Sequence, residues 1–222
     1  MKIASNQWKH IIVQNAAKLG ITVDPQQVEQ FARHALLLME WNRTTNLTAI
    51  VDPEQLAVKH YLDSIAPLAH IPAKGPLLDV GTGGGFPGIP LKIMRPDQSM
   101  TLIDSVRKKI SFIKHSIRQL SLEKIHALQV RVEDLGRRSD YAHRFHGILC
   151  RAFADPGNIL PKVSSLLAKG GRLLMYLGPG ADFSNGTVST HFERTRYQIE
   201  IIEYILPISG DKRKIAILRS IP

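Results

Sequence analysis

The clearest chemical signature is an aspartate followed by glycines in the segment LLDVGTGGGFPG, residues 77–88. A short apolar stretch surrounds Asp79, glycines follow at alternate positions, and apolar residues then recur at helical spacing through 89–94. This order predicts a buried strand, a tight turn and the start of a helix. Glycines in such a turn let the backbone adopt positive φ and let a ligand approach the main chain. The segment therefore predicts a small-molecule site at the end of the first strand.

The glycine spacing fits two classes of ligand. Residues 83–88 read G-x-G-x-x-G, the dinucleotide fingerprint, and Asp104 follows at the distance of a ribose-binding acid. Residues 79–85 read D-x-G-x-G-x-G, which equally fits enzymes that use S-adenosylmethionine. Pro87 removes an N–H donor that a pyrophosphate would need, whereas the Asp79 carboxylate suits a positively charged sulfonium. The loop therefore favours a methyl donor over a nicotinamide cofactor.

Ligands of doubly wound sheets bind at the carboxyl ends of the strands, so the residues at the other strand ends are candidates too. Asp104 ends a predicted strand, where it can accept hydrogen bonds from ribose hydroxyls or cap the next helix. Glu133 follows the third strand and is either a reader of the adenine edge or a surface charge. Arg151 and Phe153 follow the fourth strand. Arg151 can donate to guanine O6, and Phe153 can either stack on a base or belong to the core.

Two absences narrow the reaction. The segment 151–156 lacks the Asn/Asp-Pro-Pro-aromatic pattern of enzymes that methylate exocyclic amines. Cys150, the one cysteine, is not in the setting of a pyrimidine C5 nucleophile, and we expect it to be buried. An acceptor with a ready lone pair, such as guanine N7, needs neither a general base nor a covalent step, so catalysis would rest on positioning.

The elements that must hold these residues fall into two parts. Residues 1–70 read as helical, with a helix from Asp24-Pro25 to a polar loop at 42–46 and another over 53–67. From residue 71 to 222 strands and helices alternate, which predicts a mostly parallel sheet. The predicted strands are 77–80, 100–104, 126–130, 145–150, 172–177, 199–206 and 213–219, and the predicted helices are 87–94, 107–120 and 157–168. We therefore expect an α/β, Rossmann-like S-adenosylmethionine-dependent methyltransferase fold, in which a seven-stranded sheet ends in an antiparallel hairpin, with a helical extension at the N-terminus. That hairpin also argues against a complete dinucleotide fold.

The charge distribution predicts a polyanionic partner. The chain of 222 residues carries a net charge of +10, and residues 76–222 hold 22 Lys/Arg against 13 Asp/Glu. Such an excess favours nucleic acid, with a solvated basic surface as the alternative. Lys108, Lys109 and Arg213 are the candidate phosphate contacts. A single cysteine excludes an internal disulfide and any cysteine-based zinc site, and no metal site is expected. No signal core or membrane span is evident, so we expect a cytoplasmic protein.

The chain closely resembles the bacterial small-subunit rRNA guanine-N7 methyltransferase (glucose-inhibited division protein B) family, over nearly its whole length. The motifs that carry the resemblance are Trp41-Asn42, Asn46-Leu47-Thr48, His60-Tyr61-Leu62-Asp63-Ser64, LDVGTGGGFPGIP at 78–90, Arg131-Val132-Glu133 and Arg151-Ala152-Phe153-Ala154. The resemblance implies a monomeric enzyme that transfers methyl from S-adenosylmethionine to N7 of a guanosine in the 530 loop of 16S rRNA, with the 30S subunit as partner. One departure is the absence of the family's usual lysine in the segment 176–180, which puts any role of that lysine in holding RNA in doubt.

The residues expected to hold the cofactor, taken from the loop, the strand ends and the family's contact positions, are Asp79, Gly81, Gly83, Gly85, Phe86, Asp104, Val132, Glu133 and Arg151. No residue is assigned a catalytic role beyond the positioning of the base by Arg151 and Phe153. Asn46, His60 and Asp63 either line the entrance for RNA or attach the extension to the sheet. The alternatives are a non-catalytic RNA-binding or ribosome assembly factor that retains the fold, an oxidoreductase, and a small-molecule methyltransferase.

Overall fold

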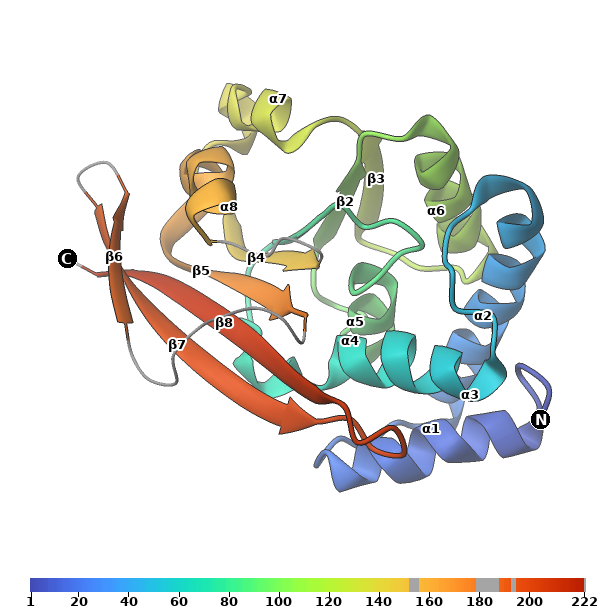
Figure 1. Ribbon diagram of the computed structural model, residues 1–222. Coiled ribbons are helices and arrows are strands. Elements are labelled where there is room, and N and C mark those ends of the chain that lie inside the picture. The colour runs from blue at the N-terminus through green and yellow to red at the C-terminus, as the bar shows by residue number, and fades with distance from the viewer. Residues whose placement is uncertain (152–155, 179–187, 193–194, 222) are drawn as a thin grey trace.

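One mixed sheet forms the centre of the molecule (Figure 1). The computed structural model describes residues 1–151, 156–178, 188–192 and 195–221. Within them the strands are β1 (Leu77–Val80), β2 (Met100–Asp104), β3 (Ile125–Gln129), β4 (Phe145–Arg151), β5 (Leu167–Leu177), β6 (Val188–Phe192), β7 (Thr195–Ile205) and β8 (Lys212–Ile221). Their order is β3-β2-β1-β4-β5-β8-β7-β6. β1 to β5 run parallel, while β8, β7 and β6 add antiparallel neighbours. The seven predicted strands and the terminal hairpin are confirmed, and β6 extends the edge by one strand.

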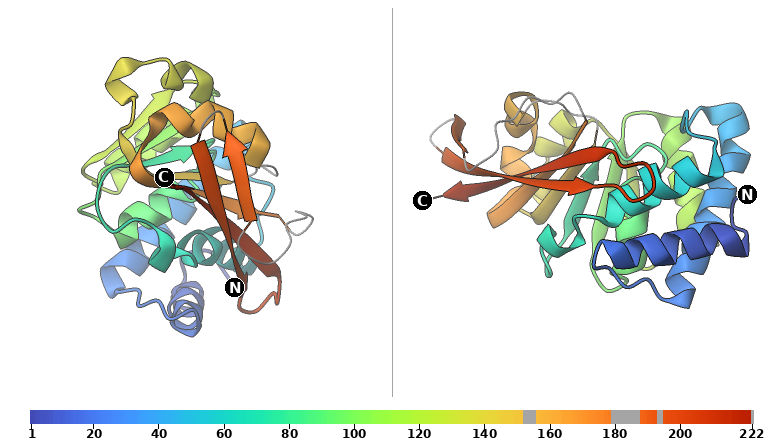
Figure 2. Two further views of the ribbon diagram at one scale, coloured as in Figure 1. Left: turned by 90° about the vertical axis from the view of Figure 1, so that its left-hand side faces the viewer. Right: turned by 60° about the horizontal axis from the view of Figure 1, so that its bottom comes forward.

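Helices cover both faces of this sheet (Figure 2). They are α1 (Asn6–Lys18), α2 (Pro25–Thr45), α3 (Pro53–Leu56), the π-helical η1 (Ala57–Leu62), α4 (Asp63–Ile65), η2 (Leu68–His70), α5 (Gly88–Met94), α6 (Arg107–Gln119), α7 (Val132–Gly136), η3 (Ser139–Tyr141), α8 (Pro156–Val163) and η4 (Ser164–Leu166). One apolar cluster joins α1–α6 to one face of the sheet, and a second joins α7 and α8 to the other. The result is the three-layer arrangement expected of alternating strands and helices.

The ends of two predicted helices were wrong, and β5 and β7 begin earlier than predicted, at Leu167 and Thr195. α2 begins as predicted, with a capping box between Asp24 and Gln27, but it continues to Thr45. The Asn42 side chain accepts hydrogen bonds from the backbone N–H groups of Leu47 and Thr48, so it stabilises the following turn and does not end the helix. The helix predicted over 157–168 spans only Pro156–Val163, because a 3-10 turn follows and β5 already begins at Leu167.

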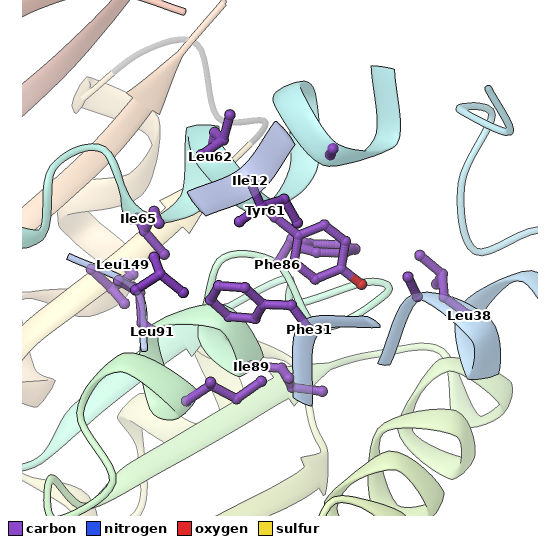
Figure 3. Packing of buried hydrophobic residues seen from close by; sticks show 14 of the residues in the cluster. Ile12, Phe31, Leu38, Tyr61, Leu62, Ile65, Phe86, Ile89, Leu91 and Leu149 are labelled. Atoms are coloured by element: carbon purple, nitrogen blue, oxygen red, sulfur yellow. The ribbon is translucent and has the colours of Figure 1, made fainter. Parts of the chain in front are cut away.

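The N-terminal helices share a continuous core with the sheet (Figure 3). Tyr61 of η1 packs edge-on against Trp8 and Phe86, with ring centroids 5.4 and 5.3 Å apart. Each large apolar side chain buried in this way contributes roughly 1.5–3 kcal/mol to folding. The division of the chain at residue 70 stays a prediction, and this shared core is what connects its two parts.

The topology places a ligand crevice at one edge of the sheet. β1 pairs with β2 on one side and with β4 on the other, so the direction of strand addition reverses between β1 and β4. At such a switch point, the crossovers on either side diverge and leave a crevice beyond the carboxyl ends of the strands. Over the described residues, none of the helices has the length and apolar character that spanning a bilayer requires.

Candidate functional site

A cavity of about 490 Å³ lies beyond the carboxyl ends of β1 to β4. Its volume is within the roughly 300–1,000 Å³ that small-molecule sites occupy. It is lined by Val80, Gly81, Ile103, Asp104, Ser105, Val106, Lys109, Val130, Arg131, Val132, Glu133, Arg151 and Lys162. The valines and isoleucine supply apolar walls, and the acids and bases supply a few polar groups, which is the composition expected for a nucleoside.

The glycine turn supports this cavity from behind. Gly81, Gly83 and Gly85 all have positive φ. A Cβ on Gly85 would also lie 2.7 Å from Ile89 Cδ1, so only glycine fits where the turn meets α5. The turn closes through hydrogen bonds from the N–H groups of Gly85 and Phe86 to the carbonyl of Thr82.

Asp79 is buried under the turn and does not line the cavity. Its Oδ2 accepts a hydrogen bond of 2.9 Å from the Gly88 N–H, and its Oδ1 has no partner among the described residues. Burial raises the pKa of the Asp79 carboxyl from 3.8 to about 6. In this position Asp79 fixes the first turn of α5, and its predicted contact with the cofactor stays a prediction.

Asp104 lies at the mouth of the cavity and is held in place by the backbone. Its Oδ2 accepts from the Gly83 N–H at 3.1 Å, and its Oδ1 accepts from the Val106 N–H at 2.9 Å. Lys109 Nζ lies 3.7 Å from Oδ2. These contacts fix a carboxylate at the end of β2, where ribose hydroxyls could donate to it. Asp104 therefore lines the cavity, whereas the predicted helix cap is not formed, because the N-cap of α6 is Val106 and no side chain caps that helix.

Glu133 forms the opposite wall together with a residue from α8. Its Oε1 lies 2.8 Å from Lys162 Nζ. This hydrogen bond lowers the pKa of Glu133, so the carboxylate remains charged beside the cavity. The neighbouring Val132 is the apolar part of this wall.

Arg151 ends β4, and its guanidinium is held by the N-terminal extension. Its Nη2 donates to the Lys59 carbonyl at 2.7 Å and lies 3.3 Å from Asp63 Oδ2. Its Nη1 lies 3.4 Å from His60 Nδ1. The π-helical turn of η1 thus presents a carbonyl and a ring nitrogen to the strand end; π-helical turns are frequent at functional sites.

His60 is neutral in this arrangement. Burial, and then the nearby Arg151 charge, lower the pKa of His60 to about 3. Because Nδ1 faces a guanidinium, it acts as the acceptor, and Nε2 carries the hydrogen that is donated to Thr48 Oγ1 at 2.7 Å. The ring also stacks on Phe86, with centroids 4.4 Å apart. His60 and Asp63 therefore attach the extension to the sheet, which is the second of the two alternatives for these residues.

A second, smaller cavity adjoins the first at Arg151. Its volume is about 240 Å³, and it is lined by Asp63, Arg151, Tyr176, Leu177, Gly178, Tyr204 and Arg213. The Tyr204 hydroxyl donates to Asp63 Oδ1 at 2.7 Å, and Arg213 Nε lies 3.7 Å from the same oxygen. The residue that separates the two cavities is thus Arg151.

Five of the nine predicted cofactor residues line the larger cavity: Gly81, Asp104, Val132, Glu133 and Arg151. The other four, Asp79, Gly83, Gly85 and Phe86, lie behind the wall or within the core. Phe153 lies outside the described residues. Cys150 is buried at the centre of the sheet, as expected.

The three residues predicted to contact RNA lie in different environments. Lys108 is exposed at the start of α6, whereas Lys109 lines the cofactor cavity. Arg213 lies in the smaller cavity, where it pairs with Asp63 and Asp211. Their contacts with RNA stay predictions, and the surroundings of the last two favour a role nearer the reaction.

Sequence reasoning missed Tyr204 as a member of a cavity and Lys162 as the partner of Glu133, and it named Asp63 only as lining an entrance for RNA or attaching the extension. No local pattern marks the contact between Tyr204 and Asp63, because it spans 141 positions of the chain. A third cavity, of about 580 Å³, lies at the opposite end of the strands, between the loops 73–76 and 95–99. It opens at the amino ends of the strands, where doubly wound folds do not bind their ligands.

The geometry agrees with the comparison with known proteins. Residues 27–187 match the family described as rRNA small subunit methyltransferase G. The chain belongs to this family. It is 37% identical over 211 residues to Ribosomal RNA small subunit methyltransferase G of Geobacter sp. (strain M21), covering 95% of this chain and 96% of that protein. It is 36% identical over 213 residues to the protein of the same name from Pelotomaculum thermopropionicum, covering 95% and 89%.

A solved structure confirms the fold independently. The chain superposes on an S-adenosylmethionine-dependent methyltransferase from Aquifex aeolicus with a TM-score of 0.55 at 15% identity, covering 83% of this chain and 98% of that one. The sequence-based assignment to the family is confirmed, and with it the methyltransferase class. The fold is the one expected, that of S-adenosylmethionine-dependent methyltransferases.

Proposed function

We propose that this family member transfers a methyl group from S-adenosylmethionine to N7 of a guanosine in the 530 loop of 16S rRNA. The observation that carries the proposal is the position of Arg151. Its side chain lies between a nucleoside-sized cavity and a smaller one, and it brings N–H donors to their junction. Arginine commonly donates to guanine O6, and a contact limited to O6 leaves the N7 lone pair free to attack the methyl group.

The walls of the larger cavity fit the cofactor. Asp104 offers a carboxylate to the ribose hydroxyls, and Val106 and Val132 offer apolar surface to the adenine. Glu133 stays ionised beside them and can accept from an exocyclic amine. Gly81, without a side chain, leaves the end of β1 open to the methionine portion.

The polar groups where the two cavities meet suit a methyl acceptor that needs no general base. When bound, S-adenosylmethionine supplies a methyl group to the N7 lone pair as its C–S bond breaks, and no proton has to be removed. In the described walls of the smaller cavity the one carboxylate is Asp63, whose oxygens face Arg151, Arg213 and Tyr204. These residues can orient a base and exclude water, and well-oriented reactants alone can supply roughly 7–11 kcal/mol.

The charge of the chain supports an RNA substrate. The net charge of +10 raises the local concentration of a polyanion, and the cavity mouth itself carries Lys109 and Arg131. Of the relatives, both curated proteins are named for methylation of the small-subunit rRNA. We further propose that the protein acts as a cytoplasmic monomer on the 30S subunit or its precursors.

The test is methyl transfer from tritiated S-adenosylmethionine to 30S subunits taken from a strain that lacks its own enzyme. The labelled RNA is digested to nucleosides, which are then separated. Label in 7-methylguanosine is the expected result. Label in another nucleoside would contradict the acceptor assignment. Cofactor binding without any label would favour the alternative of a non-catalytic assembly factor.

A further inference from the structure

We infer that the 240 Å³ cavity is the pocket for the acceptor guanine, and that Asp63 positions the two arginines that read the base. The inference deepens the proposed function and rests on it. The cavity is smaller than the roughly 300–1,000 Å³ of most small-molecule sites, which suits one ring system and not a whole nucleotide. The sugar and phosphates would remain outside.

The position of the cavity follows from the sheet. Arg151 at the end of β4 pairs with Tyr176 of β5, so the residues that follow β5 lie directly beside the cofactor cavity. Leu177 and Gly178 come from that strand end, while Tyr204 and Arg213 come from the β7–β8 hairpin. Asp63 is supplied by α4 from the third side. A base seated among them would have one edge at Arg151 and therefore at the cofactor cavity.

The polar walls select among bases. Two guanidinium groups face a single carboxylate, so the cavity is rich in donors. Guanine presents two acceptors, O6 and N7, on its Hoogsteen edge, whereas adenine presents an amino donor in place of O6. A guanidinium that donates to O6, and so leaves the N7 lone pair free for the methyl group, would face the amino donor of adenine in place of O6. The walls therefore favour guanine over adenine.

Asp63 acts by positioning the side chains that line the cavity, without contacting the reacting atoms itself. It is 3% exposed, and its two oxygens contact Arg151, Arg213 and the Tyr204 hydroxyl. Arg213 is also fixed by Asp211, 3.1 Å away, and the Tyr176 hydroxyl donates to the Ser64 carbonyl at 2.8 Å. These contacts hold the arginines and the aromatic rings before the base arrives. Enzymes that act on an extruded base commonly hold it between such apolar and aromatic walls.

Gly178 provides a way to fill the pocket without disturbing the fold. Gly178 lines the cavity, and a Cβ on it would meet no described atom within 4 Å, so Gly178→Phe places a ring at the cavity wall. Ala73→Phe is the matched control, because it adds the same ring to the cavity at the opposite edge of the sheet. The measurements are single-turnover methylation of 30S subunits, the affinity for S-adenosylhomocysteine by calorimetry, and the affinity for RNA.

We expect Gly178→Phe to lower the methylation rate by about 100-fold or more, as loss of a positioned contact does in other active sites. RNA affinity should change by less than about 3-fold, since phosphate contacts elsewhere dominate it. S-adenosylhomocysteine affinity should be unchanged, and Ala73→Phe should behave as the wild type. An unchanged rate in Gly178→Phe would overturn the pocket assignment, as would an equal loss of cofactor affinity.

Asp63 variants test the positioning role and replace Gly178→Phe if that variant unfolds. Asp63→Ala removes both the charge and the acceptors, whereas Asp63→Asn keeps one acceptor. The rate should fall in the order wild type, Asp63→Asn, Asp63→Ala, at unchanged cofactor affinity. Equal rates in all three would overturn the inference. If the wild type forms no 7-methylguanosine, the proposed function fails and the guanine assignment fails with it, whereas wild-type activity with insensitive variants overturns the pocket alone.

Discussion

His60 Nδ1 lies 3.4 Å from Arg151 Nη1, so a ring from the N-terminal extension faces the guanidinium that ends β4. The two residues are 91 positions apart in the chain. His60 is itself fixed by Thr48 on one side and by stacking on Phe86 on the other. The extension is therefore part of the site: it decides where the guanidinium between the two cavities points.

The contact predicts a graded effect of substitutions at His60. His60→Leu removes the acceptor for Arg151, and we expect the single-turnover rate of methylation to fall by about 10-fold, because the guanidinium loses one of the groups that fix it. His60→Asn retains a polar group near the former Nδ1 and should recover part of the rate. The readout is the rate at saturating cofactor and RNA. Equal rates for the two variants would mean that ring packing, and not the acceptor, matters here.

Two adjacent lysines at the start of α6 should separate RNA binding from cofactor binding. Lys108 is exposed, whereas Lys109 lies 3.7 Å from Asp104 Oδ2 and lines the cofactor cavity. Lys108→Glu should weaken RNA binding and reduce the slope of log affinity against log salt by about 1. Lys109→Glu places a carboxylate beside Asp104 and should weaken S-adenosylhomocysteine binding.

The measurements for this pair are calorimetry with S-adenosylhomocysteine and RNA binding at several salt concentrations. Each variant serves as the control for the other, because the same charge change is made one residue apart. If Lys108→Glu left the salt slope unchanged, the face that binds RNA would lie elsewhere. If Lys109→Glu left cofactor affinity unchanged, its ion pair with Asp104 would have no part in the site.

The sequence predicts the sheet well because its signals are local. The strand ending near Asp79, the glycine turn and the helix after it are encoded within residues 77–94, and the structure places each of them there. Asp104 and Arg151 are predicted to face the ligand for a similar reason: they end neighbouring parallel strands, whose carboxyl ends share one edge of the sheet.

The smaller cavity is not predictable in this way. Asp63, Arg151 and Tyr204 come from a helix, a parallel strand and an antiparallel hairpin, and tertiary packing alone brings them together. The same holds for Asp79, whose place in the glycine motif suggested a ligand contact although its carboxylate is turned to the Gly88 N–H. A motif gives the position of a residue along the chain, and the direction of its side chain depends on what packs around it.

The burial of Asp79 predicts a pH-dependent cost to stability. Its pKa is raised from 3.8 to about 6, so between these values the folded protein holds a proton that the unfolded chain has lost. The contribution of this group is therefore most favourable below about pH 4, and it falls by about 3 kcal/mol as the pH rises through 6. Asp79→Asn removes the titration but keeps an oxygen that can accept from Gly88.

We expect the free energy of unfolding of Asp79→Asn, relative to the wild type, to increase between pH 4 and pH 7. Urea unfolding of the ligand-free proteins at several pH values measures it. A relative stability that does not change across this range would contradict a buried carboxyl with a raised pKa. The comparison cancels the titration of all other groups, because those are common to both proteins.

The close approach of Asp79 and Gly88 leaves no room for a methyl group. A Cβ on Gly88 would lie 2.6 Å from Asp79 Oδ2 and 3.0 Å from Leu102 Cγ. Alanine is favoured over glycine in a helix by roughly 1 kcal/mol, but overpacking a buried site typically costs about 1–3 kcal/mol. Because both neighbours are buried, Asp79 cannot turn towards solvent.

We therefore expect Gly88→Ala to be less stable than the wild type in urea unfolding, whereas Gly178→Ala, which enters open space, should change stability by less than about 0.5 kcal/mol. Because Gly88 begins α5 directly after the glycine turn, Gly88→Ala should also weaken S-adenosylhomocysteine binding. If Gly88→Ala were as stable as the wild type, the first turn of α5 could move away from β1 without a loss of folding free energy.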